Sequence, residues 1–184
     1  WRYFFLIVLT IMTCASRRWY QFWLVAYYAC YAVYVLLEAV RKKAWVNLKR
    51  AILFALSAAV ILCVVFLPMI IVLRRANYAA SYSAYNLGGF PVELANQARF
   101  LGIGLLLIVL FGLFYGIFQQ RSRKLTLFVA ADFLLTVFLF TRIQNMGYHH
   151  TLILVPVYLL LMLICLAGLC RLEKKWILSL SSVV

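Results

Sequence analysis

Long apolar runs separated by short polar segments organise this 184-residue sequence. A helix that spans a membrane needs about 20 apolar residues, and most of the runs approach that length, so we expect an all-α polytopic transmembrane helix bundle with about six spans. We treat residues 1–184 as a single transmembrane helical domain, and the start without methionine leads us to expect a fragment of a larger membrane protein. The expected spans are residues 3–16, 19–40, 51–73, 101–119, 125–141 and 151–170.

Proline and glycine mark where these helices bend, begin or approach one another. Pro68 predicts a kink near the end of the third span. Gly88-Gly89 predicts a helix break, and Pro91 is suited to open a short interfacial helix that leads into the fourth span. Gly112-x-x-x-Gly116 permits close approach of a neighbouring helix, although this motif is common in membrane helices.

The composition excludes an ordinary soluble domain. Hydrophobic residues make up 68% of the chain and charged residues 12%, whereas about 25% of an average soluble domain is charged. The 18 Lys and Arg residues oppose only four acidic ones, which gives a net charge of +14. Because the basic residues lie mostly at the ends of apolar runs, we expect them to contact membrane lipids. No basic, aromatic-rich soluble module is visible, so we expect no nucleic-acid partner.

The distribution of the basic residues predicts the orientation. The larger share lies in residues 41–50, 121–124 and 171–175. The positive-inside rule places these segments in the cytoplasm. Segments 74–100 and 142–150 then become outer loops on the opposite side of the membrane, and we expect the functional site to lie between them.

The first outer loop offers aromatic hydroxyl groups and one acid. Tyr78, Tyr82 and Tyr85 are spaced four and three residues apart, so in a helix they would share one face. Such rings can stack on a sugar, or they can lie at the headgroup level as part of an aromatic belt. Glu93 is the only carboxyl group expected on the outer side.

The second outer loop concentrates polar groups between two apolar spans: Arg142, Gln144, Asn145, His149 and His150. The planar fork of arginine suits a phosphate or carboxylate, and histidine can donate to phosphate or move a proton. Adjacent histidines in a helix point about 100° apart and cannot easily bind one ion together, so we expect no metal site. We also expect no cofactor. The alternative interpretation is that the pair caps the sixth span among the lipid headgroups. The candidate substrate-binding residues are Arg142, His149, His150, Gln144, Tyr82, Tyr85 and Glu93.

The run Phe140-Thr-Arg-Ile-Gln-Asn-Met-Gly-Tyr-His-His150, followed by a proline-containing apolar span, resembles a segment of bacterial GT-C-type membrane glycosyltransferases. These enzymes are relatives of the dolichyl-phosphate-mannose protein mannosyltransferases. Residues 77–86, with a Tyr-Ser-Ala-Tyr core, resemble a loop of the same family. The resemblance covers about residues 74–160. It implies an outward-facing active site, a lipid-linked sugar donor carried on polyprenyl phosphate, and a place in the bacterial plasma membrane as part of the cell envelope machinery.

The chain departs from this family at the catalytic acid. The family carries that acid in an early outer loop, and this sequence has no aspartate there. If the resemblance holds, the chain is the C-terminal part of the enzyme, and it would work with other membrane subunits or with missing parts of the same chain. No residue of this sequence is assigned as catalytic.

Asp132 supports a competing hypothesis. It lies near the middle of the fifth span, where a charged carboxylate costs about 2.5–3.5 kcal/mol on insertion scales. We expect it to face the bundle interior, to be protonated, or to pair with a polar partner. A proton-relay role would fit a transporter or channel subunit, and a third hypothesis is a non-catalytic membrane scaffold subunit.

Overall fold

The computed structural model describes residues 2–17, 19–75, 78–81, 83–85 and 88–181, with the side chains of these residues apart from 2, 73, 74, 78, 79, 83 and 172–181. Every regular element within these ranges is a helix, which confirms the all-α prediction. The helices are α1 (Arg2–Ser16), α2 (Tyr20–Lys42), α3 (Trp45–Val65), α4 (Leu67–Arg75), α5 (Tyr78–Ser81), η1 (Ser83–Tyr85), α6 (Gly89–Phe118), α7 (Gln120–Thr141), η2 (Thr151–Leu154) and α8 (Val155–Ser181).

Within the described residues, five helical segments are long and apolar enough to cross a membrane, compared with the expected six or so. The first run forms α1, which has 15 residues and therefore extends only about 22 Å at 1.5 Å per residue, short of a hydrocarbon core of about 30 Å. The long segments are Tyr20–Lys42, Trp45–Val65, Gly89–Phe118, Gln120–Thr141 and Thr151–Arg171.

The helix boundaries differ from the expected ones where charged residues continue a helix. Lys49 and Arg50 were expected in a loop, but they lie in the early turns of α3. Residues 121–124 likewise lie in the first turns of α7 rather than in a turn between spans. Long basic side chains can extend toward headgroups from within a helix, so charge does not end the helix. Near Pro68 the third span does break: α3 ends at Val65 and α4 begins at Leu67, which confirms the predicted kink.

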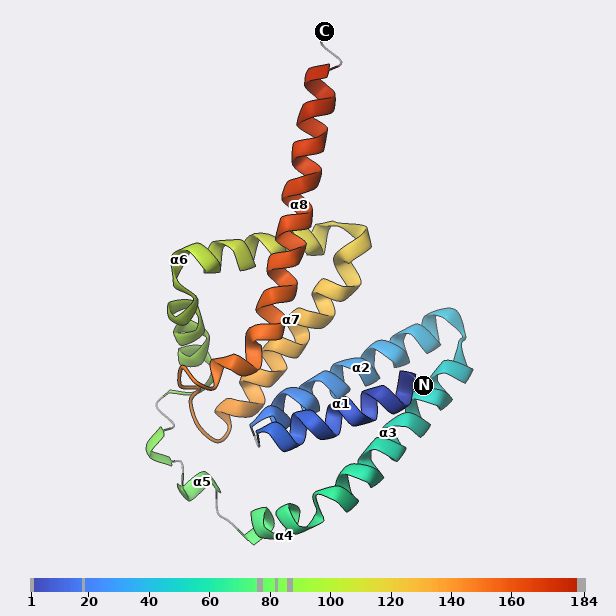
Figure 1. Ribbon diagram of the computed structural model, residues 1–184, viewed down its shortest axis with the longest axis vertical. Helices are drawn as coiled ribbons and strands as arrows, with labels where there is room; N and C mark the ends of the chain where they lie inside the picture. The colour runs from blue at the N-terminus through green and yellow to red at the C-terminus, as the bar shows by residue number, and fades with distance from the viewer. Residues whose placement is uncertain (1, 18, 76–77, 82, 86–87, 182–184) are drawn as a thin grey trace.

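The helix α6 begins earlier than expected and is divided in two. Gly88 and Gly89 adopt positive φ angles of 140° and 68°, conformations that glycine alone adopts readily, and the helix starts there with Pro91 in its first turn. This confirms the helix predicted to open at Pro91, although residues 89–100 belong to the same helix, α6, as the fourth span. Gly102 has φ 69° and ψ 167°, and Figure 1 shows α6 turning sharply midway along its length.

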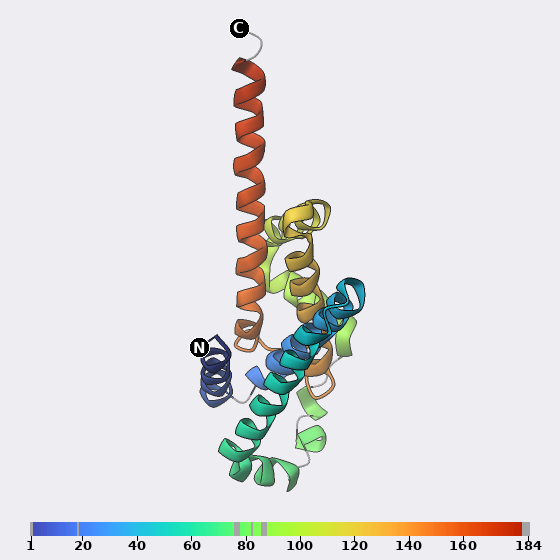
Figure 2. The same ribbon diagram turned by 90° about the vertical axis from the view of Figure 1, so that its right-hand side faces the viewer.

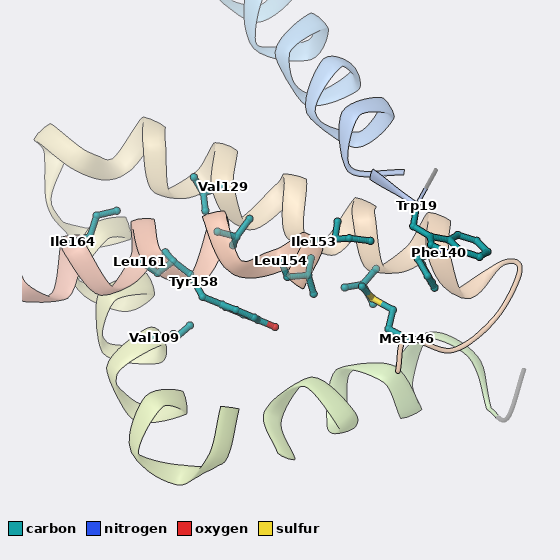
Figure 3. Packing of buried hydrophobic residues seen from close by; sticks show 12 residues of the cluster. Trp19, Val109, Val129, Phe140, Met146, Ile153, Leu154, Tyr158, Leu161 and Ile164 are labelled. Carbon is teal, nitrogen blue, oxygen red and sulfur yellow. The ribbon is translucent and has the colours of Figure 1, made fainter. Parts of the chain in front are cut away.

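The helices α6, α7 and α8 form the core, together with the start of α2. Figure 3 shows Tyr158 reaching from α8 toward α6 and Trp19 lying against Phe140 of α7. The Gly112-x-x-x-Gly116 motif allows two close contacts: a methyl group added at Gly112 would overlap the backbone of α8, and one added at Gly116 would overlap the Thr126 side chain of α7.

Much of the remaining apolar surface is exposed, which is expected for a helical protein surrounded by lipid. On α3, Leu53 is 65% exposed and Val64 is 69% exposed, and Ile103 of α6 reaches 80%. A water-soluble monomer rarely exposes apolar patches of this extent. The long apolar helices and these exposed faces together describe a membrane-embedded helical protein.

Two ends of the bundle can be distinguished. One end, here called the loop end, holds the adjoining ends of α1 and α2, the short elements α4, α5 and η1, the start of α6, and residues 142–150. The other, here called the turn end, holds the tight α2–α3 and α6–α7 connections. Helix α8 extends well beyond the other helices on the side opposite the loop end (Figures 1 and 2).

Candidate functional site

The connection between α7 and η2 folds back onto the first half of α6 at the loop end. It carries the polar residues singled out from the sequence. Met146 in the middle of this connection is 2% exposed and belongs to the core, and Figure 3 shows it beside the first half of α6. The loop is therefore packed down rather than free in solvent.

A buried carboxyl group fixes the loop. Glu93, in the second turn of α6, is 0% exposed. Its Oε2 accepts hydrogen bonds from Asn145 Nδ2 at 3.0 Å and from the backbone N–H of Met146 at 2.9 Å, and its Oε1 accepts one from Gln97 Nε2 at 2.8 Å. A buried polar group is costly unless it is hydrogen-bonded, and here both carboxyl oxygens have partners.

The same network continues from α6 into α8 through Gln97. This side chain is 2% exposed; its Nε2 also donates to Thr151 Oγ1 at 3.2 Å, and its Oε1 accepts a hydrogen bond from the Tyr158 hydroxyl group at 2.9 Å. Neither Gln97 nor Tyr158 was singled out from the sequence. The spacing of Glu93 and Gln97, one helical turn apart beside an apolar run, was the available signal.

The two expected outer loops do meet. The backbone N–H of Asn145 donates to the carbonyl oxygen of Tyr85 at 3.0 Å, and the Tyr85 side chain is 62% exposed. The expected single helical face of tyrosines is interrupted, because α5 ends at Ser81 and a separate 3₁₀ turn begins at Ser83. Tyr82 and the side chain of Tyr78 lie outside the described residues.

Arg142 and Gln144 have different surroundings. Arg142 follows the last residue of α7 and is exposed; its guanidinium group lies 5.9 Å from the centre of the Phe138 ring. Gln144 is 4% exposed and its backbone N–H donates to Phe140 O at 3.2 Å. Only Arg142 of the two is therefore available to a molecule arriving from outside the bundle.

The adjacent histidines also have different surroundings. His149 is exposed, and its carbonyl oxygen accepts a 3.5 Å hydrogen bond from Arg17 Nη1. His150 is 7% exposed and packs against Trp19 and Phe140, with ring centres 5.2 and 5.0 Å away. The two imidazole rings lie 3.8 Å apart. The expectation of rings about 100° apart assumed a helix, whereas residues 148–150 form a turn before η2.

The loop end therefore combines exposed cations with a buried acid. Within the described residues, neither Arg17 nor Arg142 forms an ion pair with a carboxylate, since both ion pairs found there involve Glu38 at the turn end. Glu93 is enclosed by its hydrogen-bond partners and does not reach the surface. The arrangement is chemically suited to an anion at the surface, held by arginine and histidine donors.

An apolar cavity lies behind the network. It has a volume of about 240 Å³ and lies, partly open, between the two halves of α6, α7 and α8. Gln97 and Tyr158 are the polar members of its lining, and Leu101, Val109 and Phe133 are among the apolar ones. The cavity could accept a hydrocarbon chain whose polar end lies toward the loop end.

Asp132 lies away from this network, at the contact of α2 with α7. It is 3% exposed, which confirms that it faces the bundle interior. Three buried polar atoms here lack a hydrogen bond of ordinary geometry: Asp132 Oδ1, Thr136 Oγ1 and Trp23 Nε1. The Trp23 indole N–H nevertheless lies near the Asp132 carboxyl group and interacts weakly with it. Asp132 and Thr136 lie one turn apart on the same face of α7.

Comparison with known proteins adds no relative. No protein-family model, no curated protein and no solved structure matches this chain. The interpretation of its function therefore depends on the residues and geometry described above.

Proposed function

We propose that the chain forms part of a membrane glycosyltransferase that moves a sugar from a polyprenyl-phosphate-linked donor at the outer face of the membrane. One observation supports the proposal above the others: the buried Glu93 network holds the loop 142–150 in place, with Arg142 and His149 exposed at its two ends. Tyr85 and Arg17 adjoin the same loop.

In this proposal Arg142 binds the phosphate of the donor. Its guanidinium group can donate two parallel hydrogen bonds to phosphate oxygens. As the bond between sugar and phosphate breaks, negative charge develops on the leaving phosphate, and a fixed cation stabilises that charge. His149 and Arg17, which meet at the His149 carbonyl oxygen, supply further donors beside the same loop.

The buried residues have a positioning role. Glu93 orients the loop through Asn145 and Met146, and Gln144 and His150 lie within the packed part of the structure. A loop that is held before the donor arrives loses less conformational entropy on binding. The proposal assigns no catalytic base to this chain.

The donor lipid also needs an apolar site. The 240 Å³ cavity between α6, α7 and α8 lies directly behind the network, because Gln97 and Tyr158 belong to both. A few isoprene units of the donor could enter this cavity while the phosphate stays at the loop end. An apolar cavity beside the network that holds the loop favours a lipid-linked phosphate over a small soluble anion.

The test is transfer of a labelled sugar from a polyprenyl-phosphate donor by the full-length protein. Replacing Arg142 by Ala removes the guanidinium group that would bind the phosphate of the sugar donor. The transfer rate should fall by about 100-fold or more, the order of effect seen when a group that stabilises developing charge is removed. Arg142→Lys keeps the charge but loses the paired hydrogen-bond donors, so its transfer rate should lie between that of the unmutated protein and that of Arg142→Ala.

Arg99→Ala is the matched control, because Arg99 is an exposed arginine on the first half of α6 that makes none of the described site contacts. It should transfer sugar at the unmutated rate. All variants must insert and remain monodisperse in detergent. Transfer by Arg142→Ala at the unmutated rate would show that Arg142 is only an interfacial anchor and would overturn the assignment.

A second candidate function is a proton-coupled transporter or channel subunit. The buried polar atoms of Asp132, Thr136 and Trp23 favour it, because they are costly to keep in a membrane helix interface without a role. Asp132→Asn keeps hydrogen-bonding capacity but cannot carry a proton. Under this alternative the variant should fold normally and lose proton uptake into vesicles; unchanged uptake would exclude it.

A further inference from the structure

A groove separates α2 and α7 at the turn end, far from the loop end. The two helices lie side by side near the loop end and diverge toward the turn end (Figures 1 and 2). The groove has a volume of about 440 Å³, within the range of about 300–1,000 Å³ typical of ligand sites. Its floor and walls are apolar, formed by Ala29, Cys30, Val33, Leu37, Leu127, Phe128, Ala131 and Leu135.

The rim of the groove is positively charged. Arg41, Lys124 and Glu38 line it together with Tyr34. Lys124 Nζ lies 2.6 Å from Glu38 Oε1 and 5.9 Å from the centre of the Tyr34 ring. Lys42 Nζ forms an ion pair with the other carboxylate oxygen, Glu38 Oε2, at 3.0 Å.

The rim charges do not balance. One carboxylate faces Lys42 and Lys124, and within the described structure Arg41 forms no ion pair with an acid. Arg41 and Lys124 both line the groove, so an anion at its rim could interact with both cations. The first turn of α7 adds the partial positive charge of a helix N-terminus.

We propose that this groove binds one anionic phospholipid, with its phosphate between Arg41 and Lys124 and one acyl chain along the apolar wall. The groove opens beside apolar helix faces, where lipid rather than water or a soluble ligand is available. Basic pockets between membrane helices recognise anionic headgroups, whereas a zwitterionic headgroup brings its own cation to the rim. The proposal does not depend on the proposed glycosyltransferase function.

Glu38 gives the proposal an unusual consequence. Its carboxylate occupies the same ammonium groups that a lipid phosphate would use, so it competes with the lipid. Replacing Glu38 by Gln should strengthen binding of an anionic lipid. If Glu38 and its lysines served only to hold α2 against α7, the same change would loosen the groove and weaken binding.

The experiment measures the lipid that stays bound to the full-length protein in detergent. The protein is titrated with phosphatidylglycerol or phosphatidylcholine, and native mass spectrometry counts the bound molecules. The unmutated protein should retain one phosphatidylglycerol in preference to phosphatidylcholine. Arg41→Ala should weaken phosphatidylglycerol binding by roughly fivefold, and Glu38→Gln should strengthen it.

Two matched controls separate the groove from the general basic surface. Lys49→Ala removes an exposed cation of α3 that lines none of the described cavities and should leave binding unchanged. Ala131→Trp fills the apolar wall and should abolish retention, whereas Ala59→Trp on the exposed face of α3 should not. The proposal is overturned by equal retention of the two lipids, by equal effects of Arg41→Ala and Lys49→Ala, by weaker binding in Glu38→Gln, or by normal retention in Ala131→Trp.

Discussion

Glu93 and Asp132 are both buried acids, but their surroundings differ. Glu93 receives three hydrogen bonds, from Gln97, Asn145 and Met146. Asp132 has an oxygen with no such bond, and no cation of the described structure forms an ion pair with it. An isolated carboxylate in an apolar interior neutralises rather than keep its charge. We therefore expect Asp132 to hold a proton.

A hydrophobic carbodiimide tests the protonation of Asp132. Such reagents dissolve in the apolar part of the membrane and add to a protonated carboxyl group, forming a stable acylurea with no leaving group. Treatment at neutral pH should add one reagent mass to the protein, and peptide mapping should place it on Asp132. The Asp132→Asn variant should gain no mass.

Glu38 provides an internal control for this labelling. It is paired with Lys42 and Lys124 and is partly exposed, so it should remain ionised and unlabelled. Labelling of Glu38 with none at Asp132 would show that the buried acid is charged or inaccessible, and the expectation would be wrong.

At the scale of the helices, α6 is the element that joins the site to the core. Its first half carries Glu93 and Gln97, which hold the loop and α8. Its second half crosses α8 at Gly112 and contacts α7 at Gly116. The contact at Gly112 requires the backbones of α6 and α8 to approach closely, which small residues permit.

A pair of glycine substitutions tests this packing. A methyl group at Gly112 would overlap the Leu161 carbonyl group, whose backbone cannot move without shifting α8. Gly112→Ala should cost about 1–3 kcal/mol of stability through overpacking. Gly104 has no atom within 4 Å of an added methyl group, so Gly104→Ala should be neutral or slightly stabilising because alanine favours helix.

Thermal unfolding of the purified variants in the same detergent measures this difference. The midpoint should fall for Gly112→Ala and stay level or rise for Gly104→Ala. Equal midpoints for the two variants would mean that α6 and α8 do not cross at Gly112.

At the scale of the whole molecule, the connections between helices lie at two ends. The same segments that the basic residues assigned to opposite sides of the membrane lie at opposite ends of the bundle. The loop 142–150 meets Tyr85 and Arg17 at one end, while Glu38 meets Lys124 at the other. All residues on one end must face the same side of the membrane. Orientation is then a single choice, and the positive-inside rule predicts that the loop end faces outward.

Cysteine labelling tests this orientation. Ala84 and Tyr148 are exposed at the loop end, and Asn47 is exposed near the start of α3. In a background without the five native cysteines, single cysteines at positions 84 and 148 should react with an impermeant maleimide added to intact cells. A cysteine at position 47 should react only after the cells are permeabilised. Reaction at position 47 alone would invert the orientation and remove the proposed outer site.

The sequence predicts much of the helical pattern because apolar runs and breaker residues act locally. The breaks at Pro68 and at Gly88-Gly89 follow from backbone geometry that one or two residues decide. The division of α6 at Gly102 was not predicted, because a glycine in an apolar run is also compatible with a continuous helix, as at Gly104.

The candidate site was less predictable because its contacts join residues distant in the chain. The loop 142–150 was identified from its polar residues, but Gln97 and Tyr158 became part of the site only through the packing of α6 against α8. The different roles of His149 and His150 depend on a turn that follows no simple period. Tertiary packing determines such contacts, and spacing alone does not reveal them.

The bend at Gly102 has a consequence for how α6 fits a bilayer. A straight helix of 30 residues would be about 45 Å long, whereas the hydrocarbon core is about 30 Å thick. A helix with that hydrophobic mismatch must tilt strongly or distort the lipid around it. By turning at one glycine, α6 reduces the depth it needs while keeping both its polar start and its apolar second half. The bend at Gly102 thereby lessens the mismatch that a straight helix of this length would have with a bilayer.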